Sequence, residues 1–149
     1  MTKKNALKKK TVGIIGLGYV GLPLLINFNK SFNVIGFDSN QKKVNNINKG
    51  ISDISHISDI SIKSIKSKFP RATTDLSLVS EVDALIICVP TPINKHREPD
   101  LSYIRKVMDE ILPYVKKNQL LSLESTTYPG TTEEIIYHKL QSTGLTAGK

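Results

Sequence analysis

The sequence has one cysteine, no tryptophan and no long hydrophobic run. A single cysteine excludes an intrachain disulfide and a metal site built from several thiolates. No apolar stretch reaches the roughly 18 residues that a membrane-spanning helix needs. The run 12–18 behind the basic N-terminus is short and interrupted by glycine, unlike a signal peptide. We therefore expect a cytoplasmic protein that has no membrane partner and binds no metal.

The single cysteine, Cys88, lies inside the apolar run at residues 84–89. In such a run a cysteine usually behaves as a small buried hydrophobic residue. A nucleophilic thiolate needs an exposed and electropositive setting, which this run does not offer. We therefore expect Cys88 to belong to the core rather than to an active site.

The net charge of +8 at pH 7 is compatible with nucleic acid, a membrane surface or anionic small molecules as partners. Five of the 21 lysine and arginine residues lie in the first ten positions, so we expect a flexible basic arm over residues 1–10. The others are dispersed and do not form a basic stripe interleaved with aromatic residues. A site for phosphorylated ligands explains the excess more simply, and we expect no nucleic-acid partner.

Short β-rich runs alternate with helical patterns along residues 11–149, which are enough for one domain. This alternation predicts a Rossmann-type α/β fold, with a doubly wound, mostly parallel sheet and helices on both faces. We expect strands at residues 11–15, 33–37, 71–74, 83–89 and 119–123, and helices at 19–29, 40–49, 58–68, 76–80, 101–116 and 131–141. Gly50 and Asp100 are the expected caps of the helices beside them.

The last residues, 142–149, have turn chemistry at a point where a doubly wound sheet usually carries another strand. We therefore expect residues 11–149 to be the N-terminal part of a larger enzyme.

A glycine loop, GLGYVG at residues 16–21, follows the first expected strand and opens the first expected helix. In this setting Gly16 makes a tight turn, Gly18 lets the backbone approach a pyrophosphate, and Gly21 lets the helix pack close to the strand. The free N–H groups and the dipole of the helix N-terminus attract the phosphates. The loop predicts dinucleotide binding.

Asp38 ends the second expected strand, 22 residues after Gly16. At this spacing a carboxylate accepts hydrogen bonds from the ribose hydroxyls and repels a 2′-phosphate, which favours NAD over NADP. A second interpretation makes Asp38 a cap of the helix that begins at residue 40, and the two roles can coexist. Lys42 and Lys43 weaken the preference for NAD, because either can meet a phosphate.

Three segments together resemble the N-terminal, NAD-binding domain of the UDP-glucose/GDP-mannose dehydrogenase family: GLGYVGLPL at residues 16–24, CVPTP at 88–92 and ESTTYPGTT at 124–132. The resemblance covers residues 9–149. Residues 97–103 and Glu124 are most similar to the bacterial UDP-N-acetylglucosamine 6-dehydrogenase branch.

The resemblance implies oxidation of the C6 alcohol of a UDP-sugar, with UDP-N-acetylglucosamine favoured, to a uronic acid in two NAD-dependent steps. Such a reaction belongs to polysaccharide synthesis. The pyrophosphate would lie on the glycine loop, including Tyr19 and Val20, and the adenosine ribose beside Asp38 and Lys43. The resemblance also places near the cofactor Val89, Pro90, Thr91, Ser125 and Thr126, with the Thr126 hydroxyl positioning a catalytic water. Without the resemblance, residues 125–127 are better explained as a plain turn after a strand.

The family uses a cysteine nucleophile from a later segment, and Cys88 does not match it. We therefore expect this chain to bind NAD without completing the oxidation, and the full-length enzyme to be a homo-oligomer built around a central helix that precedes a substrate domain. Two other functions stay open, a stand-alone dinucleotide-binding or interaction module without catalysis and another Rossmann dehydrogenase of the 6-phosphogluconate or hydroxy-acid type. We expect no special function for His56 in its loop.

Overall fold

The computed structural model describes residues 9–93 and 97–148, so the basic arm expected at residues 1–10 lies outside the described residues except for Lys9 and Lys10. The described residues form a five-stranded sheet in the order β3-β2-β1-β4-β5, with every pairing parallel. The strands are β1 (Thr11–Ile15), β2 (Asn33–Phe37), β3 (Ala72–Thr73), β4 (Ala84–Ile87) and β5 (Leu120–Leu123). The strand order reverses between β1 and β4, which confirms the doubly wound, Rossmann-type sheet.

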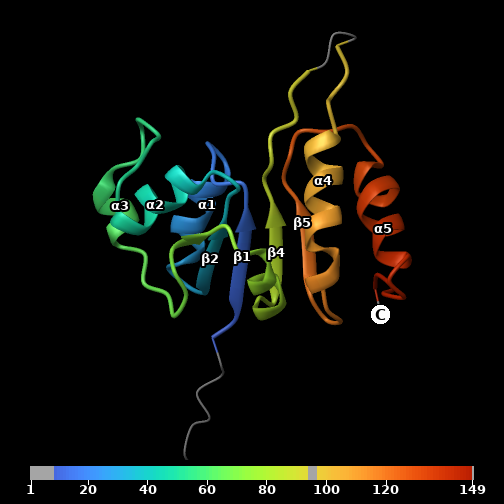
Figure 1. Cartoon of the computed structure of the whole chain (residues 1–149), viewed down its shortest axis with the longest axis horizontal. Coiled ribbons are helices and arrows are strands. Elements are labelled where there is room, and N and C mark those ends of the chain that lie inside the picture. Colours follow the sequence, from blue (N-terminus) through green and yellow to red (C-terminus); the bar gives the residue numbers. More distant parts are fainter. Residues whose placement is uncertain (1–8, 94–96, 149) are drawn as a thin grey trace, which may run out of the picture.

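Helices cover both faces of this sheet. One face carries α1 (Gly21–Phe28), α2 (Gln41–Lys49) and α3 (Asp59–Lys63), and the other α4 (Ser102–Ile111) and α5 (His138–Gln141) with three helical turns, η1 (Leu76–Glu81), η2 (Leu112–Tyr114) and η3 (Thr132–Tyr137). In Figure 1, α1, α2 and α3 lie together on the left, and α4 and α5 on the right. No helix among the described residues is long and apolar enough to cross a membrane.

Two apolar clusters hold the layers together, and the strands contribute to both. Alternate residues of β1 face opposite sides, so Ile14 packs with Leu25 of α1 while Ile15 packs with Met108 of α4. All five residues of β1 are buried. This burial explains why the strand reads as a continuous apolar run instead of an alternating one.

Helix α2 is capped at both ends, and its C-terminal cap is the predicted one. The Asn40 side chain accepts a hydrogen bond from the Lys43 backbone N–H at 3.1 Å. At the other end Gly50 adopts a left-handed conformation, with φ of 79°, and closes the helix. Helix α2 is therefore confirmed together with its C-terminal cap.

Two predicted helices are shorter than expected. The helix expected at residues 101–116 ends as an α-helix at Ile111, because Pro113 has no N–H to continue the ladder, and a 3-10 turn, η2, follows. The helix expected at 58–68 ends at Lys63. Beyond it, Ser67 Oγ donates to Val34 O at 2.6 Å and Lys66 N donates to Asn29 Oδ1 at 2.9 Å, so tertiary contacts replace helical ones.

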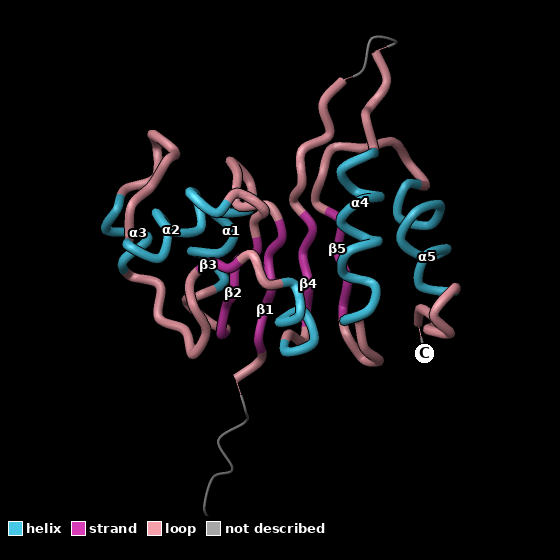
Figure 2. The backbone as a smooth tube through the Cα atoms, in the orientation of Figure 1, coloured by secondary structure: helices cyan, strands magenta, loops and turns pink. Residues whose placement is uncertain are grey.

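The remaining elements differ in detail. The strand expected at residues 71–74 is reduced to Ala72–Thr73, and the helix expected at 131–141 begins as a π-helix, η3, before continuing as α5. Leu101, not Asp100, occupies the N-cap position of α4. Asp100 still orders that end of the helix, since its Oδ1 accepts from Ser102 N at 2.9 Å. In Figure 2 the short strand β3 lies beside β2, and α5 lies beside α4.

Candidate functional site

The carboxyl ends of the parallel strands meet at one edge of the sheet, toward which the arrows of β1 and β4 point in Figure 1. The glycine loop follows β1, Asp38 follows β2, residues 88–91 follow β4 and residues 124–127 follow β5. We call the last two segments the hydroxyl loops. All cofactor-binding positions predicted from the sequence lie on these four segments or, for Lys43, in the first turn of α2. In an open α/β sheet this edge is where ligands bind.

The glycine loop is held tightly at its two ends. Gly16 has a φ of +88°, and its N–H donates to Phe37 O at 2.8 Å. A Cβ added at Gly21 would lie 1.9 Å from Gly16 O, so the start of α1 has no room for any side chain. The turn predicted at Gly16 and the close packing predicted at Gly21 are therefore present.

The middle of the glycine loop is open. A Cβ added at Gly18 would have no neighbour within 4 Å. Tyr19 and Val20 beside it are 73% and 52% exposed, and no side chain caps the first turn of α1. The loop thus presents uncovered backbone at a helix N-terminus, the arrangement that binds phosphate groups.

Asp38 is almost buried, with 9% of its side chain exposed. Its Oδ2 accepts hydrogen bonds from Leu17 N at 3.0 Å and from Lys43 Nζ at 2.9 Å, and its Oδ1 accepts from Asn40 N at 2.9 Å. The N-cap of α2 is Asn40, so Asp38 orders the turn before the helix rather than capping the helix itself. Sequence reasoning placed Asp38 and Lys43 at the same ribose but missed that they form an ion pair.

A cavity of about 520 Å³ opens between Gly16, Asp38 and the hydroxyl loop that follows β4. Its far wall comes from α4, through Tyr103, Lys106 and Glu110. This is the point where the strand order reverses, and its volume is in the range of small-molecule and cofactor sites. The contribution of α4 was missed from the sequence, because an amphipathic pattern does not show which strand ends a helix will face.

Each hydroxyl loop donates a side-chain hydrogen bond to a backbone carbonyl of the other. Ser125 Oγ donates to Val89 O at 2.7 Å, and Thr91 Oγ1 donates to Thr126 O at 2.7 Å. The Thr126 side chain itself is exposed. Residues 125–127 are therefore part of a structure shared with the neighbouring loop, which an isolated turn would not provide.

Cys88 is half-buried and packs against the core cluster that includes α1. Burial, with a smaller contribution from the charge of Glu124, raises the pKa of its thiol to about 11. The thiol is protonated at neutral pH, which makes it a poor nucleophile. The structure thus favours a packing role, although the side chain is less buried than expected.

His56 lies against the glycine loop, where no role was expected for it. Its ring stacks on the Tyr19 ring, with centroids 5.7 Å apart and planes inclined by 21°. The contact joins the connection between α2 and α3 to the exposed middle of the glycine loop. Nothing in the sequence signals it, because the two residues are 37 positions apart.

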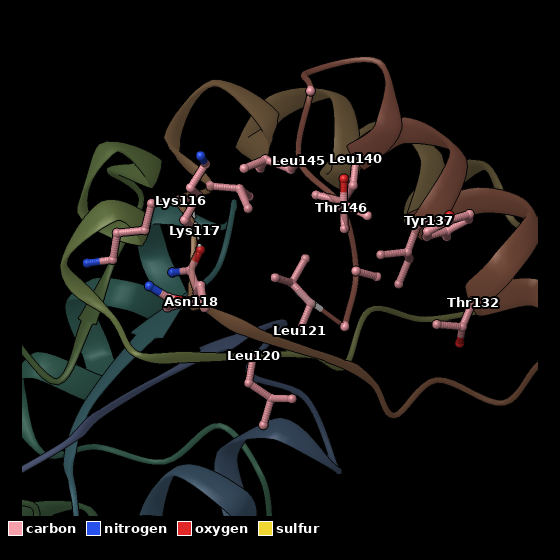
Figure 3. A pocket seen from close by; sticks show the side chains of 16 residues that line it. Lys116, Lys117, Asn118, Leu120, Leu121, Thr132, Tyr137, Leu140, Leu145 and Thr146 are labelled. Atoms are coloured by element: carbon pink, nitrogen blue, oxygen red, sulfur yellow. Dashed lines mark hydrogen bonds between the residues drawn. The ribbon is translucent and has the colours of Figure 1, made fainter.

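A second cavity, of about 570 Å³, lies on the far side of β5 (Figure 3). Leu121, Tyr137, Leu140 and Leu145 line it together with the turn at residues 116–118. None of the predicted site residues lines this cavity. Among the described residues, no group of three or more histidine, cysteine or acidic side chains is arranged to hold a metal ion.

Comparison with known proteins identifies the family of the chain. The sequence model of the UDP-glucose/GDP-mannose dehydrogenase family, NAD binding domain, matches residues 10–147. The chain belongs to this family. The matched region contains every residue that the sequence predicted for the cofactor site, and the cofactor of the family domain is NAD.

Relatives named for different sugars match the chain to a similar degree. A UDP-N-acetyl-D-glucosamine 6-dehydrogenase of Pseudomonas aeruginosa is 37% identical over 86% of this chain and 30% of the relative. A UDP-N-acetyl-D-mannosamine dehydrogenase of Escherichia coli K12 is 39% identical over 84% of this chain and 30% of the relative.

Among solved structures, an NDP-N-acetyl-D-galactosaminuronic acid dehydrogenase from Methanosarcina mazei Go1 matches with a TM-score of 0.83 and 31% identity. The match covers 94% of this chain and 32% of that one. The chain thus spans about a third of the length of its relatives.

Proposed function

We propose that this chain is the NAD-binding part of a nucleotide-sugar 6-dehydrogenase. The full enzyme would oxidise the C6 alcohol of a UDP-sugar to a uronic acid in two NAD-dependent steps. The observation that carries the proposal is the cavity bounded by Gly16 and Asp38 at the reversal of strand order. The names of the relatives support a nucleotide sugar as the substrate.

The residues fit a dinucleotide. The open backbone at Gly18, Tyr19 and Val20 would bind the pyrophosphate between the tight turns at Gly16 and Gly21. Asp38 and Lys43, which both line the cavity, would bind the adenosine ribose. When bound, NAD would supply the hydride acceptor for the oxidation.

The hydroxyl loops would form the nicotinamide side of the site. Val89, Pro90 and Thr91 would lie beside the cofactor, with Val89 and Pro90 in the cavity wall. Ser125 and Thr126 would approach the nicotinamide, and the exposed Thr126 hydroxyl would position a catalytic water. The hydrogen bonds between the loops support this assignment, because they bring the two segments to one place.

UDP-N-acetylglucosamine is the proposed substrate of the full enzyme, on the basis of residues 97–103 and Glu124. We do not assign the covalent nucleophile of the reaction to Cys88, because it packs against the core cluster and burial raises the pKa of its thiol. The chain by itself would therefore bind NAD and turn over no UDP-sugar. The cytoplasmic location, the homo-oligomeric full-length enzyme and the absence of nucleic-acid and membrane partners remain predictions from the sequence.

Calorimetric titration of the chain with NAD and with NADP tests the proposal. We expect NAD to bind more tightly, and Asp38→Ala to weaken its binding. Absorbance measurements with NAD and UDP-N-acetylglucosamine should show no NADH from this chain. Tighter binding of NADP would overturn the role of Asp38. Failure of both dinucleotides to bind, together with a salt-sensitive shift of DNA, would favour an interaction module.

A further inference from the structure

The ion pair between Asp38 and Lys43 in the wall of the cofactor cavity changes what Asp38 can do there. Lys43 Nζ lies 2.9 Å from Asp38 Oδ2, and the two side chains are only 28% and 9% exposed. The pair is therefore less screened by water than a surface ion pair. The Lys43 backbone N–H donates to the Asn40 side chain in the first turn of α2. This hydrogen bond fixes the Lys43 backbone near the end of β2.

The charges around the cavity balance one another. Its lining contains two cations, Lys43 and Lys106, and two anions, Asp38 and Glu110. Lys106 and Glu110 lie 3.9 Å apart on α4, so each cation has an anion near it. A lone carboxylate would repel the 2′-phosphate of NADP, whereas this cavity has no excess of negative charge to do so.

We propose that Lys43 sets the selectivity of this site between NAD and NADP by cancelling the charge of Asp38. The inference rests on the proposed function, since it requires the adenosine ribose to lie beside Asp38. Asp38 still accepts hydrogen bonds, so the ribose hydroxyls of NAD are recognised. Its repulsion of a 2′-phosphate is offset by the attraction of the same phosphate to Lys43, and NAD is preferred only modestly.

The test is the ratio of the dissociation constants for NADP and NAD, measured by calorimetry on the whole chain. Lys43→Gln removes the cation and leaves the carboxylate, so it should raise the ratio by about tenfold at low salt. Asp38→Asn leaves the cation alone and should lower the ratio by about tenfold. Lys43→Arg should keep the wild-type ratio, because the charge is restored.

Lys42→Gln is the matched control. It removes the same charge one residue away, from an exposed side chain that does not line the cavity, and should change the ratio less than about twofold. The effect of Lys43→Gln should shrink as the salt concentration rises, which a purely structural effect would not do.

The outcomes separate the inference from the proposed function. An unchanged ratio in Lys43→Gln, including an equal loss of affinity for NAD and NADP, would overturn the inference. The proposed function would still stand if the wild-type chain binds NAD. If the wild-type chain binds neither dinucleotide, the proposed function itself fails. If Lys43→Gln does not fold, the direction of the change in Asp38→Asn still decides between the outcomes, and a ratio that does not fall in this variant would overturn the inference.

Discussion

The glycine loop and the hydroxyl loops lie on the same edge of the sheet, but different groups shape them. In the glycine loop the backbone is fixed by places where no side chain fits, such as Gly21, whose Cβ would lie 1.9 Å from Gly16 O. In the hydroxyl loops the backbone is fixed by side chains, through the bonds of Ser125 and Thr91 to carbonyls of the opposite loop. A side chain added at Gly21 should therefore disturb the fold, whereas a change in the hydroxyl loops should only weaken a local contact.

Gly21→Ala is the strongest way to challenge this comparison. The added methyl group would collide with Gly16 O, and backbone cannot move aside as a flexible side chain can. We expect a loss of at least about 3 kcal/mol in the free energy of unfolding and the loss of NAD binding. Urea denaturation and calorimetry would measure the two effects. A variant as stable as the wild type would show that the start of α1 is not so tightly packed.

Gly18→Ala is the matched variant within the same loop. Its methyl group would meet no atom within 4 Å. The free energy of unfolding should therefore change by less than about 1 kcal/mol. The affinity for NAD should still fall by roughly tenfold, because the methyl group would keep the backbone away from the pyrophosphate. Unchanged affinity would place the pyrophosphate elsewhere.

Ser125→Ala tests the hydroxyl loops. It removes the 2.7 Å hydrogen bond to Val89 O at a half-buried position, which should cost about 1 kcal/mol of unfolding free energy. The control is Thr126→Ala, since the Thr126 side chain is exposed and its contact with the other loop uses only its backbone carbonyl. Equal destabilisation by the two changes would contradict the roles given to these side chains.

Cys88 begins the hydroxyl loop at residues 88–91 and lies beside Gly16, and its reactivity can be tested without any substitution. Its carbonyl oxygen lies 2.8 Å from the position of a Gly16 Cβ, and its thiol has a pKa raised to about 11 by burial and by Glu124. At pH 7 the thiolate fraction should be roughly 100-fold lower than that of an ordinary cysteine, and alkylation correspondingly slow. The rate should increase with pH as the thiolate forms. Rapid alkylation at pH 7 would instead indicate an activated nucleophile.

The same contrast explains what could be predicted from the sequence. Strands β1 and β2 were predicted to the residue, since continuous β-branched runs and the following glycine and aspartate mark them clearly. The positions of the glycine loop and Asp38 also follow from local spacing. The ion pair of Lys43, the stacking of His56 on Tyr19 and the wall formed by α4 depend on how separate segments meet. No local pattern encodes those contacts.

Helix lengths were predicted wrongly from the sequence where tertiary contacts replace helical hydrogen bonds. The helix expected to reach residue 68 ends at Lys63, because Ser67 and Lys66 bond to Val34 and Asn29 instead. The α-helix of α4 ends two residues before Pro113, whose missing N–H is a local signal for that end. The π-helical start of the last helix has no signal that we recognise in its sequence.

The two crossed hydrogen bonds between the hydroxyl loops have a mechanical consequence. Because Ser125 holds Val89 and Thr91 holds Thr126, neither loop can shift along the sheet edge without carrying the other. The ladder between β4 and β5 continues into them, with Glu124 N donating to Ile87 O at 2.9 Å. The position of Thr126 is thereby tied to the register between β4 and β5. A ligand that displaces one hydroxyl loop would therefore displace the other with it, and the position of Thr126 relative to Val89 would be kept.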